Sequence, residues 1–191
     1  MFSISESGYL IVTDLNNTQV QGGKYLTSNG LNTTAGLKAM IHDMQRNILF
    51  IASGAGEIFI FNCIPTTPEL ITKVETDKKV CIRGLSRSVN CGGFWLSSGR
   101  PGMKNGGLTQ NYLMSSDING YITIFDIGKP GKEKLTKRIG FTQGKSKQRV
   151  VLWRDHGREI ISGDEDGYVT FWLAKEGTPL YVIHAHTGPI T

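Results

Sequence analysis

The sequence predicts an all-β protein built from repeated four-stranded antiparallel units. Short apolar runs alternate with turn residues along the chain, and they are too short and too closely spaced to form helices. Four glycines, Gly8, Gly56, Gly120 and Gly167, each open a run of β-branched and aromatic residues, as is typical of a strand that follows a tight turn. These glycines are 48, 64 and 47 residues apart, so a unit of more than forty residues recurs along the chain.

The last unit, residues 141–184, shows the pattern most clearly. Its apolar runs are separated at Asp155 to Arg158 and at Asp164 to Gly167, where aspartate and glycine offer local hydrogen bonds and tolerate positive φ. The expected strands are Val150 to Trp153, Glu159 to Ser162, Tyr168 to Leu173 and Leu180 to Ile183.

Two further units precede it. Residues 35–76 carry four expected strands, LKAMIHD, NILFIAS, GEIFIFN and ELITKVE. Residues 77–140 begin a strand near Val80 and resume the pattern at Asn111, after a glycine-rich insert at residues 97–108. The insert explains why the middle interval between turn glycines is the longest.

Both ends carry pieces of units. Within residues 1–34, Phe2 to Ser5 and Gly8 to Leu15 match the second and third strands, and Val20 to Leu26 the fourth, whereas residues 185–191 begin another first strand. Either these pieces join into one composite unit, or the remaining units come from sequence beyond these residues or from another polypeptide. An incomplete stack would expose apolar sheet faces, so we expect poor solubility or self-association.

A period in the forties with four strands per repeat is typical of a β-propeller blade, and the chain resembles the WD-repeat family. The resemblance is strongest from Ser162 to Trp172, at Ala185 to Gly188 and from Ser115 to Ile127, although Leu173 and Thr13 depart from the pattern. It implies a WD-repeat β-propeller domain, or a fragment of one, over residues 1–191. We expect about four blades, three complete and one split or incomplete, and therefore a partial propeller.

A fainter similarity links two segments to WD-repeat proteins that contain a FYVE zinc domain. These segments are YITIFDIGKPGKE and the run from Trp153 to Trp172. No cysteine-rich FYVE pattern is present, so the lipid-binding role of that subgroup is not transferred to this chain.

The resemblance also implies a structural hydrogen-bond network. Ser162, Asp166 and Trp172 match three of its positions, Thr142 or Gln143 lies near the fourth, and His186 would serve the next blade. A catalytic Ser-His-Asp set is disfavoured, because no Gly-x-Ser-x-Gly turn is present and these residues belong to different parts of one repeat. We expect no catalytic, cofactor or metal site, and no enzyme activity.

Two features are candidates for partner binding. Trp153 and Arg154 end an inner strand, where propellers display binding groups, although packing against a neighbouring blade is the alternative for Trp153. The other is a basic segment that would contact phosphates or an acidic surface, or form a solvated strand and loop. Its candidate residues are Lys129, Lys132, Lys137, Arg138, Lys145, Lys147 and Arg149.

Composition is typical of an ordinary globular chain. The 191 residues are 39% hydrophobic and 19% charged, with a net charge of +5, and no run is long or apolar enough to span a bilayer. The start lacks signal-peptide features and the three cysteines form no framework, so a cytoplasmic location is the default. We expect a non-catalytic scaffold that binds proteins within a larger complex; the alternative is a module that reads phosphates on anionic lipid or nucleic acid through residues 129–149.

Overall fold

The computed structural model describes two compact units, which we treat separately. The units are Met1–Ile82 and Arg83–Thr191. The described residues are 2–12, 35–44, 47–63, 68–75, 82–88, 112–127, 134–140 and 146–191.

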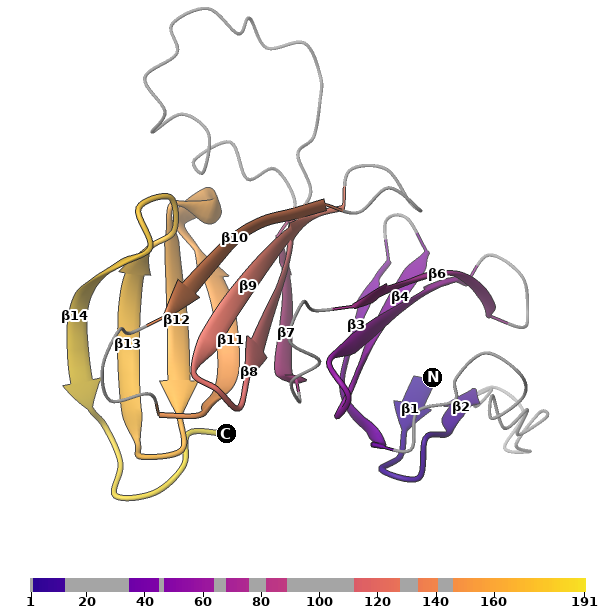
Figure 1. Cartoon of the computed structure of the whole chain (residues 1–191), viewed down its shortest axis with the longest axis horizontal. Coiled ribbons are helices and arrows are strands. Elements are labelled where there is room, and N and C mark those ends of the chain that lie inside the picture. The colour runs from indigo at the N-terminus through magenta and orange to yellow at the C-terminus, as the bar shows by residue number, and fades with distance from the viewer. Residues whose placement is uncertain are drawn as a thin grey trace, which may run out of the picture. The chain divides into compact units, whose positions relative to one another are not determined.

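The first unit consists of two antiparallel sheets (Figure 1). The N-terminal sheet pairs β1 (Phe2–Ile4) with β2 (Leu10–Val12). The first sheet has the strand order β3-β4-β5-β6. Its strands are β3 (Leu37–Asp43), β4 (Ile48–Ser53), β5 (Glu57–Asn62) and β6 (Glu69–Glu75).

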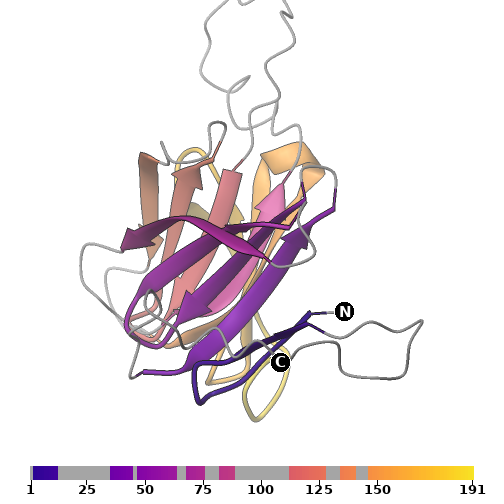
Figure 2. The same ribbon diagram turned by 90° about the vertical axis from the view of Figure 1, so that its right-hand side faces the viewer.

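The core of this unit lies between its two sheets. Leu10 of the N-terminal sheet is fully buried against Leu49, Ile51, Phe59 and Phe61 of the first sheet. Figure 2 shows the indigo hairpin of the N-terminal sheet beside the purple strands of the first sheet. Because side chains alternate along a strand, Leu10 faces the first sheet and the other side of the hairpin faces away from it.

The second unit contains two four-stranded sheets. The second sheet has the order β10-β9-β8-β7 and the third sheet the order β11-β12-β13-β14 (Figure 1). The second sheet comprises β7 (Ile82–Ser88), β8 (Tyr112–Asp117), β9 (Tyr121–Asp126) and β10 (Lys134–Gly140). The third comprises β11 (Gln148–Arg154), β12 (Glu159–Asp164), β13 (Tyr168–Leu173) and β14 (Thr178–His184).

The second and third sheets share one hydrophobic core. Tyr112, Met114 and Ile122 of the second sheet contact Ile160 and Trp172 of the third, and all five are 0% exposed. Burial of these large apolar side chains is the main favourable contribution to packing one sheet on the other.

The predicted all-β class is confirmed, and the described strands pair in antiparallel sheets. The strand expected to begin near Val80 is described from Ile82 to Ser88. Helical structure among the described residues is limited to one 3-10 turn, Asp155–Gly157, where Asp155 and Gly157 take positive φ. Both the fourth strand expected at residues 20–26 and the insert at residues 97–108 lie outside the described residues.

The four turn glycines that mark the repeat all have left-handed backbone conformations. Their φ values are 87° at Gly8, 81° at Gly56, 79° at Gly120 and 85° at Gly167. Other residue types are strained in this region, since their Cβ atom collides with the backbone. The repeat seen in the sequence therefore reflects a backbone requirement of each hairpin.

Replacement of Gly167 by alanine tests this requirement. The new Cβ would collide with the carbonyl oxygen of His186 in addition to the strain at φ 85°. We expect Gly167→Ala to lower the free energy of unfolding by about 1 to 3 kcal/mol. Gly188→Ala is the matched control, because a Cβ there meets nothing within 4 Å. Urea denaturation measures both variants, and equal midpoints would contradict the expectation.

Candidate interaction surface and the turns that position it

In each of the four sheets, the hairpin turn that contains the repeat glycine is capped by a side-chain oxygen three residues before that glycine. Asp164 Oδ1 accepts the amides of Asp166 and Tyr168 at 3.0 and 2.9 Å. The same role is filled by Asp117 Oδ1 for Asn119 and Tyr121, by Ser53 Oγ for Ala55 and Glu57, and by Ser5 Oγ for Tyr9. These local bonds hold the turn in one conformation.

The turn also fixes the inner strand of its own sheet. Directly after the capping residue, the Gly54 amide donates to Gly36 O at 2.9 Å. In the third sheet, the Glu165 amide likewise donates to Lys147 O at 3.0 Å. Both acceptors immediately precede the inner strands β3 and β11.

The carbonyl of the capping residue holds the start of the following inner strand. In the first unit, the amide of Leu37, the first residue of β3, donates to Ser5 O at 3.3 Å. In the second unit, the amide of Ile190 donates to Asp164 O at 2.9 Å. Ile190 therefore lies where an inner strand begins.

The structure brings together two of the four residues expected in the hydrogen-bond network. Trp172 Nε1 donates to Ser162 Oγ at 2.9 Å, and both residues are almost fully buried. Asp166 is exposed, and the turn carboxylate is that of Asp164. His186 is also exposed and donates its backbone amide to Gly167 O at 3.2 Å. Thr142 and Gln143 lie outside the described residues.

The sequence interpretation missed Asp164 because it followed the family motif to Asp166. A signal was present in the repeat itself, since serine or aspartate stands three residues before each of the four turn glycines. A short polar side chain at this position suits a turn, because its oxygen reaches amides two and four residues ahead.

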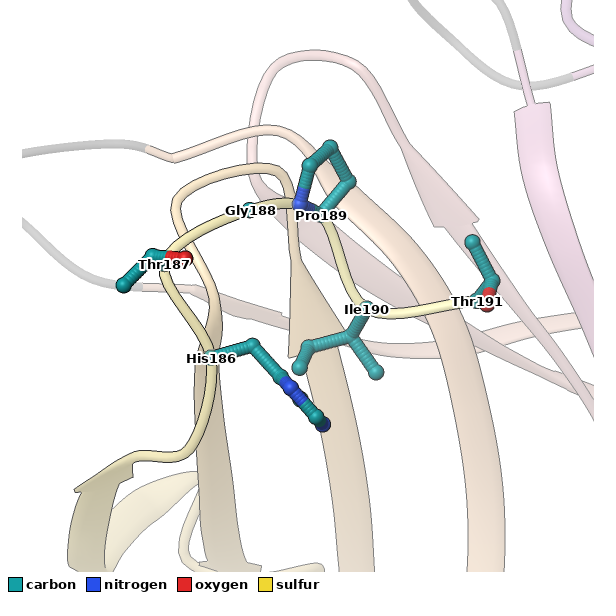
Figure 3. A pocket seen from close by; sticks show the side chains of 6 residues that line it. All are labelled: His186, Thr187, Gly188, Pro189, Ile190 and Thr191. Atoms are coloured by element: carbon teal, nitrogen blue, oxygen red, sulfur yellow. The ribbon is translucent and has the colours of Figure 1, made fainter.

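The C-terminal tail forms a shallow hollow over this turn. A pocket of about 300 Å³ is lined by residues 186–191. Figure 3 shows the His186 and Ile190 side chains pointing toward one another, with Pro189 on the other side of the tail. A Cβ on Gly163 would lie only 2.5 Å from Ile190 Cγ2. The tail therefore packs directly on β12, and its pocket holds a single ionisable side chain, His186.

Trp153 and Arg154 point to opposite faces of β11. Trp153 packs against the core shared by the second and third sheets, with its ring centroid 6.5 Å from that of Tyr112. Arg154 has a half-exposed side chain, pairs with Glu159 at 3.0 Å and lies 5.8 Å from the centre of the Phe171 ring. Of the two, Arg154 is therefore the one available to a partner.

The described part of the basic segment is partly neutralised. Lys147 Nζ and Arg149 Nη1 lie 3.2 and 3.9 Å from the two oxygens of Glu165. The Arg138 guanidinium lies 5.0 Å from the centre of the Tyr121 ring, a cation–π distance. Lys137 belongs to β10. Lys129, Lys132 and Lys145 lie outside the described residues.

The third sheet presents an apolar face opposite its core, which we call the open face. It contains Leu152, Ile161, Val169, Phe171, Tyr181 and Ile183, which lie side by side in the strand register. Leu152 is 54% exposed, and Tyr181 and Ile183 are each 48% exposed. The Phe171 and Tyr181 rings stack with centroids 4.4 Å apart. From the sequence, these residues are expected only as parts of strands.

The outer strands differ in their sequence content of charged residues. β6 contains Glu69, Lys73 and Glu75, and β10 contains Lys134, Lys137 and Arg138, whereas β14 has no acidic residue, lysine or arginine. Charges on edge strands oppose unwanted association. Every residue of β14 is nevertheless exposed, so an uncharged apolar strand is accessible to a partner.

The ionisable side chains of the described part of the chain bear on metal binding and on thiol reactivity. No group of three or more His, Cys, Asp or Glu side chains there could hold a metal ion. Partial burial raises the pKa of the Cys63 thiol, and this outweighs the opposing effect of its hydrogen bond to the Leu49 backbone. Within the same residues, no helix is long and apolar enough to cross a membrane.

Comparisons with known proteins identify the fold but not a family. No protein-family profile matches the chain, and no curated protein matches it. A chain in the crystal structure of the mitotic checkpoint complex aligns with a TM-score of 0.70 at 14% identity, over 98% of this chain and 49% of that chain. This likeness is consistent with a WD-like propeller fold.

The second similar structure is the computationally designed Ika8 protein. It aligns with a TM-score of 0.61 at 17% identity, over 100% of this chain and 48% of that chain. The chain thus spans about half the length of both structures. Because 1075 chains of solved structures match, the fold alone does not define a function.

The Trp172–Ser162 contact leads to a stability prediction. Ser162→Ala removes a buried hydrogen bond, so we expect the free energy of unfolding to fall by about 1 to 2 kcal/mol. Ser116→Ala is the control, because the buried Ser116 Oγ has no hydrogen-bond partner among the described residues; its removal should be neutral or stabilising. Thermal denaturation of both variants checks this. Equal losses of stability in the two variants would show that the Trp172–Ser162 hydrogen bond does not stabilise the fold.

Proposed function

We propose that this protein is a non-catalytic interaction scaffold with a WD-repeat-type partial propeller of about four blades. The observation that carries the proposal is the TM-score of 0.70, over 98% of the chain, to a chain in a multiprotein complex. Sheets whose turns are held by side-chain hydrogen bonds support the same role, since a preformed surface loses little conformational entropy on binding. The partners are other proteins within a complex.

The chemistry of the described residues favours this role over catalysis. Ser162, the serine of the expected network, is buried and accepts the Trp172 indole N–H, so its hydroxyl is occupied by a structural bond. The Cys63 thiol has a raised pKa, which reduces the fraction of reactive thiolate at neutral pH.

Charge pairing favours a protein partner over a phosphate surface. Glu165 lies beside both Lys147 and Arg149 and offsets one of their two positive charges. Phosphate binding depends on uncompensated cations and weakens steeply with salt, whereas apolar contacts such as those offered by Leu152 and Tyr181 do not. The alternative ligand is anionic lipid or nucleic acid, and the binding experiment described below must exclude it.

Separate substitutions at Trp153 and Arg154 test the role of this strand end. We expect Trp153→Ala to destabilise the fold by about 3 kcal/mol, because its ring packs on the core. Arg154→Ala should leave stability within about 0.5 kcal/mol of the parent and weaken partner binding. Chemical denaturation measures the first effect, and cross-linked complexes recovered from source cells and quantified by mass spectrometry measure the second.

The binding experiment is repeated at increasing salt concentrations, and the purified chain is also tested against two anionic probes. Protein complexes should persist when the salt concentration is raised, and the purified chain should not sediment with phosphatidylserine vesicles or shift single-stranded RNA. Salt-sensitive binding to either probe, lost on substitution of Lys129, Lys132 and Lys145, would support the phosphate-reading alternative instead. Unchanged protein binding by Arg154→Ala would remove Arg154 from the interface.

A further inference from the structure

The outer strand of the third sheet exposes apolar side chains on both of its sides. Among the described residues, β14 pairs with β13 alone and forms the outer edge of this sheet (Figure 1). Val182 and Ile183 are each 48% exposed. Ile183 belongs to the open face, whereas Val182 is in register with the buried Thr170 and Ser162 on the core side. The accessible apolar surface therefore extends around the edge of the sheet.

The other two four-stranded sheets carry a cation at the position that Val182 occupies. In each sheet this position pairs with the residue three places after the turn glycine. The pairs are Lys73 with Phe59, Arg138 with Thr123, and Val182 with Thr170. Lys73 forms an ion pair with Glu57 at 2.9 Å, and Arg138 lies over the Tyr121 ring. Because a charge on an edge strand opposes the addition of another strand, the third sheet lacks a protection that the other two sheets have.

An added strand would contact both exposed sides of β14, whereas a sheet laid on the open face would not. Such a sheet would cover Tyr181 and Ile183 and leave Val182, on the opposite side, exposed to water. A strand placed beside β14 directs its own side chains alternately to the two sides, so it meets both Val182 and Ile183. Its backbone also supplies hydrogen-bond partners for the outer edge of β14.

The composition of β14 indicates the chemistry of the segment that fits it. Pro179 offers no amide donor, and the register shift against β13 lies beside it, so regular pairing is available along residues 181–184. β14 has no acidic residue, lysine or arginine, and a charge that loses its water beside Val182 or Ile183 would be costly. The matching segment is extended and uncharged, with β-branched or aromatic residues that form cross-strand pairs.

We propose that β14 binds an extended, uncharged segment of a partner protein, which adds a strand to the third sheet beside residues 181–184. In this mode of recognition, main-chain hydrogen bonds supply affinity and alternate side chains supply specificity. The inference names the chemistry of the partner for the proposed scaffold function, and it rests on that function.

Fluorescence anisotropy of a labelled peptide of alternating threonine and valine, titrated with the purified full chain, tests the proposal. We expect binding, together with slower amide hydrogen exchange at residues 181–184. Val182→Lys places a cation where the first and second sheets have one, and it should raise the dissociation constant at least about 10-fold. Leu152→Lys is the matched control. Leu152 is 54% exposed on the open face, and its strand β11 lies at the opposite edge of the sheet from β14, so this variant should bind the peptide normally.

A second peptide, with N-methyl groups on its central residues, cannot donate main-chain hydrogen bonds there and should not bind. Equal binding of this peptide overturns the proposal even if Val182→Lys fails to fold. Absence of binding at about 1 mM of the unmodified peptide also overturns it. Weaker binding by Leu152→Lys alone would assign the peptide to the open face, and self-association that Val182→Lys abolishes would assign β14 to a second copy. Either result replaces the proposed occupant.

The cross-linking experiment separates this inference from the proposed function. If protein complexes are recovered equally with the parent chain and with Val182→Lys, the scaffold function stands and strand addition at β14 is wrong. If the parent chain yields no protein complexes, the scaffold function itself fails.

Discussion

The capped hairpin turn is the interaction on which the described sheets depend. In each unit, a serine or aspartate oxygen accepts amides from the turn, and a glycine with φ near 80° completes it. The amide that follows the capping residue, or the carbonyl of the capping residue itself, then bonds at the start of an inner strand. The Glu165 amide donates to Lys147 O, and Asp164 O accepts the Ile190 amide. One local element thus joins three strands, so its loss would affect both a sheet and the chain that follows it.

This constraint explains why the repeat is visible at low sequence identity. Packing between sheets tolerates exchanges among large apolar side chains, and Phe61, Phe125 and Trp172 occupy the same buried position after the turn glycine. The turn tolerates much less, because only glycine adopts its φ without strain and only short polar side chains reach its amides. The backbone therefore aligns with known structures at a TM-score of 0.70 although only 14% of the residues are identical.

The strands and turns could be predicted from sequence because their signals are local. Alternation of apolar residues and the turn glycines gave the bounds of β3 and β13 directly, and placed β5 within one residue of its start. The roles of Trp153 and Arg154 could not be separated in this way, because they depend on which face of β11 meets the second sheet. Likewise, nothing local distinguishes the open face from a buried one: Phe171 and Trp172 are neighbours in sequence, and only the packing of whole sheets assigns them opposite environments.

The absence of charge on β14 links the fold to association. An exposed edge strand in a protein that acts alone is normally protected by charges or irregularities, and β6 and β10 both carry them. β14 combines Leu180, Tyr181, Val182 and Ile183, all exposed, in an uncharged strand. Because charged residues are present on the equivalent strands of this chain, their absence here is not a general property of its composition. β14 instead carries a proline, Pro179, and a register shift against β13, while its apolar side chains remain accessible to a partner.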